Sequence, residues 1–164
     1  MSSELQKIDH SALKVSQISI VALNVLAFVL NAPWLALVVA LLMSAGYAFK
    51  FPAFGFVYKY ILKPAGLVKP DVLDDYPEPH RFAQGLGGIF MLLGSVALFN
   101  SMAVLGWVLV WLVAALAALN AFGGFCVGCF IYYWLGRFKL TGFRQSPPPG
   151  TFPGRRPQGA NHDA

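Results

Sequence analysis

Residues 104–135 read VLGWVLVWLVAALAALNAFGGFCVGCFIYYWL, and this segment decides the fold. It lies within a stretch from Phe82 to Gly136 that contains no Asp, Glu, Lys or Arg, and a second such stretch runs from Val15 to Phe49. A helix that crosses a bilayer needs about 20 apolar residues. A soluble domain of 164 residues could not bury two stretches of this length. The sequence therefore predicts an integral membrane protein.

The composition supports this class and excludes another. Hydrophobic residues make up 57% of the chain and charged residues 12%, whereas a typical soluble domain is about 25% charged. The formal net charge is +5. In a membrane protein basic residues chiefly report orientation, so we do not interpret this charge as nucleic-acid binding.

The predicted fold is all-α and polytopic, with four transmembrane helices. The residues Asn31-Ala32-Pro33 separate the first two helices, because proline lacks the N–H that a continuing helix needs. The last segment is too long for one simple span, and we expect it to break at Gly123-Gly124, before a shorter helix that carries the cysteines. The four predicted spans are residues 15–30, 34–49, 82–99 and 104–135.

The segments outside the spans differ in character. An aromatic, lightly basic stretch over residues 52–63 predicts a helix in the membrane interface between spans two and three, and an acidic, proline-rich loop follows it. Residues 1–14 form a polar N-terminal segment. Residues 137–164 are rich in Pro, Gly and Arg, which predicts a disordered tail.

The basic residues predict the topology. All 12 Lys and Arg lie before the first span, in the connection between spans two and three, or after Gly136, and the two short connections carry none. The positive-inside rule then places both termini and the central connection in the cytoplasm. We expect a multi-pass protein of the inner (plasma) membrane, in contact with the lipid bilayer.

The two cysteines of the chain form one CxxC pair, Cys126 and Cys129. At the start of a helix such a pair brings its sulfurs within disulfide range, and the helix dipole stabilises one thiolate. Cytoplasmic thiols stay reduced unless they cycle, so a permanent disulfide is not expected. A redox role and simple packing beside Gly128 both stay open. His10 and His80 lie on the same side of the membrane, but no spacing brings them to the cysteines, so we predict neither a metal site nor a cofactor.

Other candidate site residues stand near the cytoplasmic ends of the spans. Arg81 is the candidate charge partner that would lower a cysteine pKa or hold an anion, although an arginine at a span end commonly anchors to headgroups. Polar residues within spans usually hydrogen-bond between helices. The further candidates are His80, Gln84, Gln17 and Asn120.

Two stretches, PEPHRFAQGLG and LNAFGGFCVGCFIYYWL, together with DHSALKVSQ, resemble a family of small bacterial membrane proteins, domain of unknown function 4395. The resemblance covers residues 10–136, and its P-x-RFAQ and FCxGCxxY elements are fairly specific. His80 stands where the family often has lysine. The resemblance implies four spans and no assigned activity. Its members are often encoded near thioredoxin-like or sulfurtransferase proteins, which favours thiol or sulfur chemistry at the cysteine pair.

These observations give three functional hypotheses. The leading one is a thiol-redox or sulfur-handling membrane component that uses Cys126 and Cys129 with a cytoplasmic thioredoxin-like or sulfurtransferase partner. The second is a small transporter or channel for a sulfur-containing anion, working as a homo-oligomer. The third is a structural or assembly subunit whose cysteines only pack. Whether the protein is an enzyme stays open at this stage.

Overall fold

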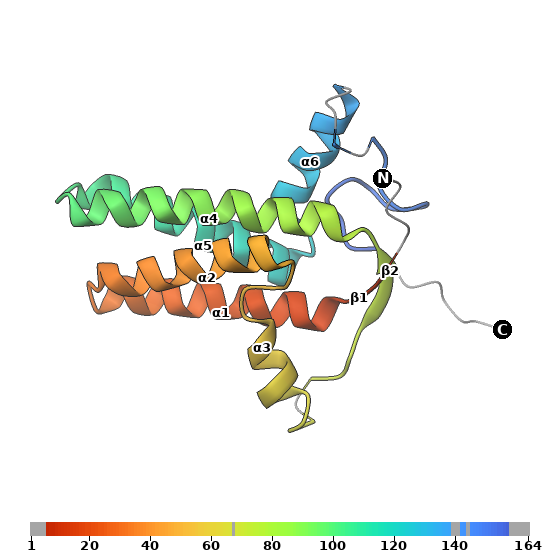
Figure 1. Ribbon diagram of the computed structural model, residues 1–164, viewed down its shortest axis with the longest axis horizontal. Coiled ribbons are helices and arrows are strands. Elements are labelled where there is room, and N and C mark those ends of the chain that lie inside the picture. The colour runs from red at the N-terminus through yellow and green to blue at the C-terminus, as the bar shows by residue number, and fades with distance from the viewer. Residues whose placement is uncertain (1–5, 67, 139–141, 144, 158–164) are drawn as a thin grey trace.

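The computed structural model describes residues 6–66, 68–138, 142–143 and 145–157. Four helices form an antiparallel bundle in which α2 packs on α4, α4 on α5, α5 on α1 and α1 on α2 (Figure 1). The bundle helices are α1 (His10–Val29), α2 (Pro33–Phe49), α4 (Pro77–Phe99) and α5 (Ala103–Gly123). The smaller elements are β1 (Gln6–Asp9), α3 (Gly55–Val57), the π-helical turn η1 (Tyr58–Leu62), β2 (Val72–Asp75) and α6 (Val127–Arg137).

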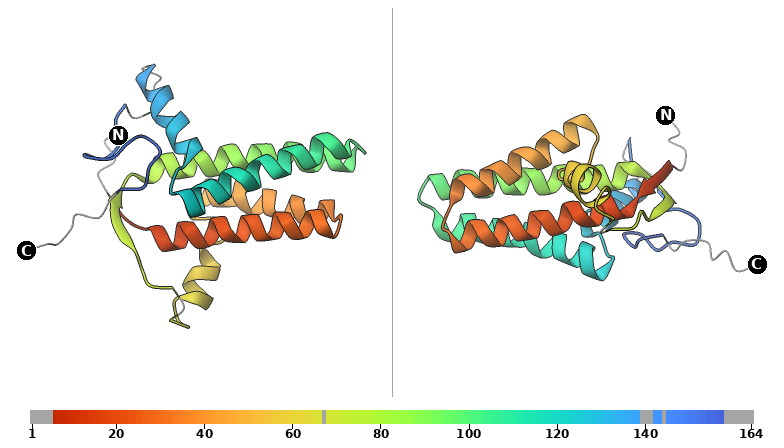
Figure 2. Two further views of the ribbon diagram at one scale, coloured as in Figure 1. Left: turned by 180° about the vertical axis from the view of Figure 1, so that it is seen from behind. Right: turned by 90° about the horizontal axis from the view of Figure 1, so that it is seen from below.

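The two ends of the bundle differ. At one end, tight turns join α1 to α2 and α4 to α5, and Asn31 and Ser101 adopt positive φ angles of 46° and 62° there. The strands, α3, η1, α6 and the described part of the tail all lie at the opposite end (Figure 2). Every charged residue that the structure describes lies at this second end, which we call the charged end. The parts of the four bundle helices that lead from it to the tight turns carry no charged residue.

Three helices, α1, α4 and α5, are long and apolar enough to cross a membrane. The fourth, α2, is equally apolar but has only 17 residues, so the predicted count of four spans is not confirmed. Only 22% to 28% of the residues in the three apolar windows are buried within the protein. Large apolar side chains such as Val29, Trp34 and Val104 are exposed, which suits contact with lipid.

The last predicted span is broken where the glycines predict it. Helix α5 ends at Gly123, Gly124 takes a left-handed φ of 62°, and α6 starts at Val127. Helix α6 then leans away from the bundle axis but stays packed on α4 (Figure 1). A Cβ at Gly128 would lie 2.5 Å from Cβ of Ala83, so only glycine permits this close approach of α6 to α4.

Strands β1 and β2 are an addition to the all-α prediction. They pair antiparallel, with Lys7 opposite Asp74 and Asp9 opposite Val72. Each has four residues, too few to show a pattern of alternating apolar residues. The backbone N–H of His10 donates to Asp71 O at 2.8 Å, so the two-stranded sheet and this hydrogen bond hold β2 beside the start of α1.

A helical segment over α3 and η1 matches the helix predicted for residues 52–63. Its N-terminal side is buried against the bundle, where the backbone N–H of Phe54 donates to Ser16 Oγ at 3.2 Å. Tyr58 is also buried, and its hydroxyl donates to Asp9 at 2.7 Å. Burial and this carboxylate raise the pKa of Tyr58 to about 12. Tyr60 and Ile61 are exposed, so this segment presents apolar side chains outward.

The described part of the tail lies against the protein, although the sequence predicts disorder for residues 137–164. Phe125 and Arg155 form an isolated antiparallel bridge, and Arg156 pairs with Asp71. The ring of Phe152 stacks on that of Phe130 of α6. Prolines and glycines give no periodic signal for such contacts, because these are made through backbone atoms and single side chains. The rest of the predicted tail, residues 139–141, 144 and 158–164, lies outside the described residues.

Candidate functional site

The cysteine pair sits at the N-terminus of α6. Cys126 is the N-cap residue, and its sulfur accepts a hydrogen bond of 3.1 Å from the backbone N–H of Cys129. The two sulfurs are joined as a disulfide, with the Cα atoms 5.2 Å apart. Both cysteines are buried, with exposures of 5% and 3%. The first amides of a helix have no intrahelical partner, so they favour negative charge on the Cys126 sulfur when the disulfide opens.

The described part of the tail is hydrogen-bonded to the backbone around the cysteine pair. The backbone N–H of Cys126 donates to Gly154 O at 2.7 Å, and that of Arg156 donates to Gly124 O at 3.2 Å. Gly154 adopts a positive φ of 84°, which glycine takes without strain. These bonds satisfy backbone groups next to the disulfide, and they fix the position of the tail beside it.

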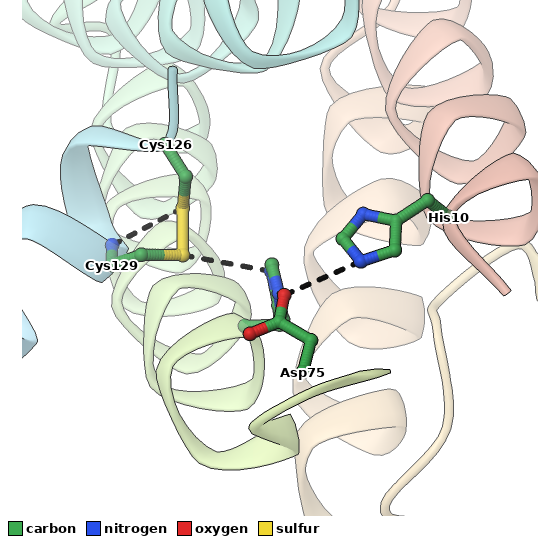
Figure 3. Close-up of a disulfide and its surroundings, with 5 residues drawn as sticks. His10, Asp75, Cys126 and Cys129 are labelled. Atoms are coloured by element: carbon green, nitrogen blue, oxygen red, sulfur yellow. Dashed lines mark hydrogen bonds and ion pairs between the residues drawn. A yellow bond between two sulfur atoms is a disulfide. The ribbon is translucent and has the colours of Figure 1, made fainter. Parts of the chain in front are cut away.

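A cluster of two histidines and one aspartate, in which His10 and Asp75 are buried and His80 is half-buried, adjoins the disulfide (Figure 3). On α4, His80 places Nδ1 3.6 Å from Cys129 Sγ and Nε2 2.8 Å from Asp75 Oδ2. On α1, His10 places Nε2 3.3 Å from the same oxygen of Asp75. The rings of His10 and His80 meet edge to face. The first helix, β2 and α4 thus each contribute one member.

The electrostatics of the cluster centre on Asp75, which is 4% exposed. Burial by itself raises the pKa of this carboxyl, but the two imidazoles of His10 and His80 at Oδ2 and the hydrogen bond from the Tyr76 N–H outweigh it. The net result is a pKa well below the ordinary range, so the carboxyl is ionised at neutral pH. When Nε2 of His80 carries the proton that faces Asp75, the lone pair of Nδ1 faces Cys129.

Two cavities meet at the disulfide. A polar cavity of about 150 Å³ faces the charged end, and its lining includes His10, Asp75 and Cys129. An apolar cavity of about 130 Å³ extends into the bundle between α1, α4, α5 and α6. Five residues line both: Leu13, Gln17, His80, Asn120 and Cys126. Cys126 therefore borders both spaces, whereas Cys129 borders only the polar one.

The structure brings most of the predicted site residues together. His80 contacts Cys129, while Gln17 and Asn120 line both cavities. Gln84 lines the apolar cavity but also has a structural role, since its amide donates to Met43 O of α2 at 3.0 Å.

Arg81, the predicted charge partner of the cysteines, lies apart from the other predicted site residues. It lines neither of the two cavities, and its buried Nε has no hydrogen-bond partner among the described residues. Neighbouring residues on a helix point about 100° apart, so His80 faces the disulfide and Arg81 does not.

Sequence reasoning missed Asp75 as a site residue and found nothing that would bring His10 to His80. The structure corrects this, because strand pairing places β2 beside the starts of both α1 and α4. One feature of the sequence could have indicated the cluster. Each histidine stands shortly before an apolar span that starts on the same side of the membrane, and an acidic segment precedes His80.

Some of these side chains have the chemistry and spacing of metal ligands. One group is His80, Cys126 and Cys129, and the other is His10, Asp75 and His80, with ligand atoms within 4.8 Å of one another in each. The first group requires the dithiol form, since sulfurs in a disulfide are not thiolate ligands. In that group His80 already has the carboxylate partner that orients many metal-binding histidines.

The fold and the site define a class of protein: an apolar helical bundle of the membrane type, with a CxxC disulfide capping a helix beside a His–Asp–His cluster. Within this class, the chain belongs to the family described as Domain of unknown function (DUF4395), whose model matches residues 8–137. Neither a curated protein nor a solved structure matches the chain.

Proposed function

We propose that the protein is a thiol-redox component of the membrane in which Cys126 and Cys129 cycle between disulfide and dithiol. The observation that carries the proposal is the asymmetry of the pair. Cys126 caps α6 and accepts the Cys129 N–H, while Cys129 contacts Nδ1 of His80. One sulfur thus has a stabilised thiolate and the other has a proton acceptor, as a dithiol that exchanges disulfides requires.

Each side chain has a role in the exchange. A thiolate of a partner protein attacks Cys126 Sγ, the disulfide breaks, and Cys129 leaves as a thiolate that takes a proton from protonated His80. The second thiol of the partner passes its proton to His80, attacks Cys126 Sγ of the mixed disulfide and releases Cys126 as a thiolate at the N-terminus of α6. The net result is a disulfide in the partner and a reduced pair here, with Cys129 as thiol and Cys126 as thiolate. Two electrons and one proton are transferred, and a proton from solvent completes the dithiol. The exchange runs in either direction, according to the relative potentials.

The polar cavity is the side on which a soluble partner would approach. Its rim carries the basic side chains of Lys14, Arg155 and Arg156, which suits a thioredoxin-like or sulfurtransferase protein with an acidic contact surface. His80, rather than Arg81, takes the charged role beside the sulfurs in this proposal, because Arg81 does not border the cavity.

The membrane arrangement is part of the proposal. Helix α2 is the fourth span, since it lies in the bundle as a full neighbour of α1 and α4 and its 17 residues extend about 26 Å. The basic residues that the structure describes lie at the end that carries the disulfide, so the positive-inside rule places this end and both termini in the cytoplasm of a bacterial inner membrane.

The basic rim of the polar cavity also favours a second candidate, a transporter for a sulfur-containing anion. Uptake of labelled thiosulfate or sulfite into proteoliposomes separates the two functions. Uptake above that of empty vesicles, retained in Cys126→Ser, would favour transport, and no uptake would count against it.

The test of the redox function uses a matched pair of variants in purified protein. Incubation with oxidised glutathione is expected to leave a stable glutathione adduct on Cys126 in Cys129→Ser, because the resolving thiol is missing. Cys126→Ser is expected to form its adduct at least about tenfold more slowly, since Cys129 is more buried and lacks the helix N-terminus. The wild type is expected to convert in one two-electron step between disulfide and dithiol as the ratio of reduced to oxidised glutathione changes. Equal reactivity of the two variants, or a wild-type disulfide that never opens, would overturn the proposal.

A further inference from the structure

The apolar cavity is the feature that the thiol exchange leaves without a role. Its lining contains no Lys, Arg, Asp or Glu, and it enters the bundle from the disulfide as far as Phe90 and Val113. Its volume of about 130 Å³ is close to that of apolar cavities of about 150 Å³ that hold one benzene ring. The space therefore suits a single uncharged ring, whereas a phosphate-bearing cofactor would find no cation in this lining.

The polar side chains that line both this cavity and the polar one are Gln17, His80 and Asn120, whereas Ser16 and Gln84 in its lining are already hydrogen-bonded to backbone groups. Neither Gln17 nor Asn120 has a hydrogen-bond partner for its side chain within the part of the chain that the structure describes. Each amide offers an N–H₂ group, and a ring with carbonyl oxygens would accept from it. His80 borders the same cavity and adds a group that carries protons.

The part of the cavity that α5 lines lies close to the apolar outer surface of the bundle. Leu112 and Leu116 of α5 line it and are themselves exposed on the apolar surface of the bundle. A ligand with a long apolar tail could therefore place its ring inside while the tail stays in the bilayer. Ser16, Ile20 and Met43 close the cavity on the opposite side.

From these observations, and resting on the proposed redox function, we propose that the apolar cavity binds the ring of a lipid-soluble quinone that oxidises the Cys126/Cys129 dithiol. Cys126 borders both cavities, so it exchanges with a soluble thiol partner on the polar side and meets the quinone on the apolar side. In the quinone step two S–H bonds break and one S–S bond forms. Two electrons and two protons pass to the quinone, and its two carbonyl oxygens become hydroxyls. His80 takes the Cys129 proton in this step.

The test measures oxidation of the purified dithiol protein by ubiquinone-1, a short-chain quinone whose ring carries few sites for non-specific thiol addition. Quinol formation and the loss of free thiols are followed together. Ala117→Phe fills the apolar cavity from α5, and the matched control Ala115→Phe adds the same ring on the exposed face of that helix. Oxidised glutathione serves as the water-soluble oxidant for every variant.

We expect Ala117→Phe to lower the second-order rate constant for oxidation by ubiquinone-1 by at least about tenfold, with oxidation by glutathione unchanged and Ala115→Phe equal to the wild type. A second variant, Gln17→Leu, is expected to raise the quinone concentration that half-saturates the oxidation rate more than it lowers the saturating rate, because it removes a hydrogen bond to the bound ring. Gln17→Leu also covers the case in which Ala117→Phe does not fold.

The outcomes separate this inference from the proposed function. A wild-type dithiol that glutathione oxidises but ubiquinone-1 does not would overturn the quinone site and leave thiol exchange standing. Equal quinone rates in the wild type, Ala117→Phe and Gln17→Leu would also overturn it. A dithiol that neither reagent oxidises would remove both proposals.

Discussion

Two sets of polar side chains are buried among the helices, and their surroundings differ. In the middle of the bundle Asn24 of α1 is 2% exposed and donates to Met91 Sδ of α4 at 3.7 Å, among apolar neighbours. At the charged end His10, Asp75 and His80 form a chain of contacts that ends at a disulfide and borders a cavity. The first set joins two helices and borders neither of the two cavities. The second connects ionisable groups to a reactive bond and to open space.

This difference shows which buried polar groups can carry chemistry. A polar residue within a span usually serves helix packing, and Asn24 fits that reading. The cluster instead holds an ionised carboxylate and two imidazoles, one of which contacts the disulfide. Variants of the two sets are therefore expected to separate activity from stability.

The largest effect is expected at His80. His80→Ala removes the proton acceptor beside Cys129, so oxidation of the dithiol by oxidised glutathione should slow by about 10²-fold. Added imidazole should restore part of the rate, because the vacated space borders the polar cavity. The matched control is Arg81→Gln on the next residue of α4, which should change the rate by less than about twofold. A larger loss in Arg81→Gln than in His80→Ala would reverse the assignment of the two residues.

A smaller effect, on stability against pH, is expected at Asp75. Its pKa is lowered in the folded protein, whereas an unfolded Asp ionises near about 3.9. The unfolded chain therefore binds more protons between the two values, and the stability that Asp75 contributes is present above about pH 4 and is lost progressively as the pH falls from there toward the folded pKa. Asp75→Asn should unfold at a lower temperature near neutral pH and should lose this part of the acid dependence. Thermal unfolding in detergent over that range measures both.

An Asp75→Asn protein with the same acid dependence as the wild type would show that other carboxyls carry it. Asp74, which is adjacent on β2 and pairs in register with Lys7, offers the matched variant Asp74→Asn. We expect Asp74→Asn to keep the acid dependence.

The smallest effect on activity is expected at Asn24. Asn24→Leu keeps a similar volume and removes Oδ1, which is buried without a hydrogen-bond partner in the described structure. The thermal midpoint should stay the same or rise, and the rate of thiol exchange should stay within about twofold of the wild type. A loss of exchange in Asn24→Leu would mean that the middle of the bundle is coupled to the disulfide, and the contrast between the two sets would fail.

The parts of the molecule that follow local rules could be predicted from the sequence. Uncharged stretches predict the apolar helices, and Gly123-Gly124 predicts the break before the cysteine helix. The prediction that the two sulfurs lie within disulfide range at a helix start rests on the three-residue spacing of Cys126 and Cys129 and on the glycine break before them.

The environment of the pair could not be predicted, because it depends on contacts between distant segments. His10 and His80 meet through Asp75 only after β1 pairs with β2. Sequence offers no reason to prefer His80 over Arg81, since their difference is which face of α4 each occupies. The contact of Gly154 with Cys126 is a backbone hydrogen bond and leaves no trace in residue type.

The most direct test of the account is the redox state of Cys126 and Cys129 in intact cells. Free thiols are trapped with a membrane-permeant maleimide before a mild oxidant, after it and after recovery, and an impermeant maleimide reports the side of the membrane. The account predicts that both thiols are lost and regained together, with labelling by the permeant reagent alone. Two cysteines that keep one state throughout would contradict the redox function, and labelling by the impermeant reagent would contradict the orientation.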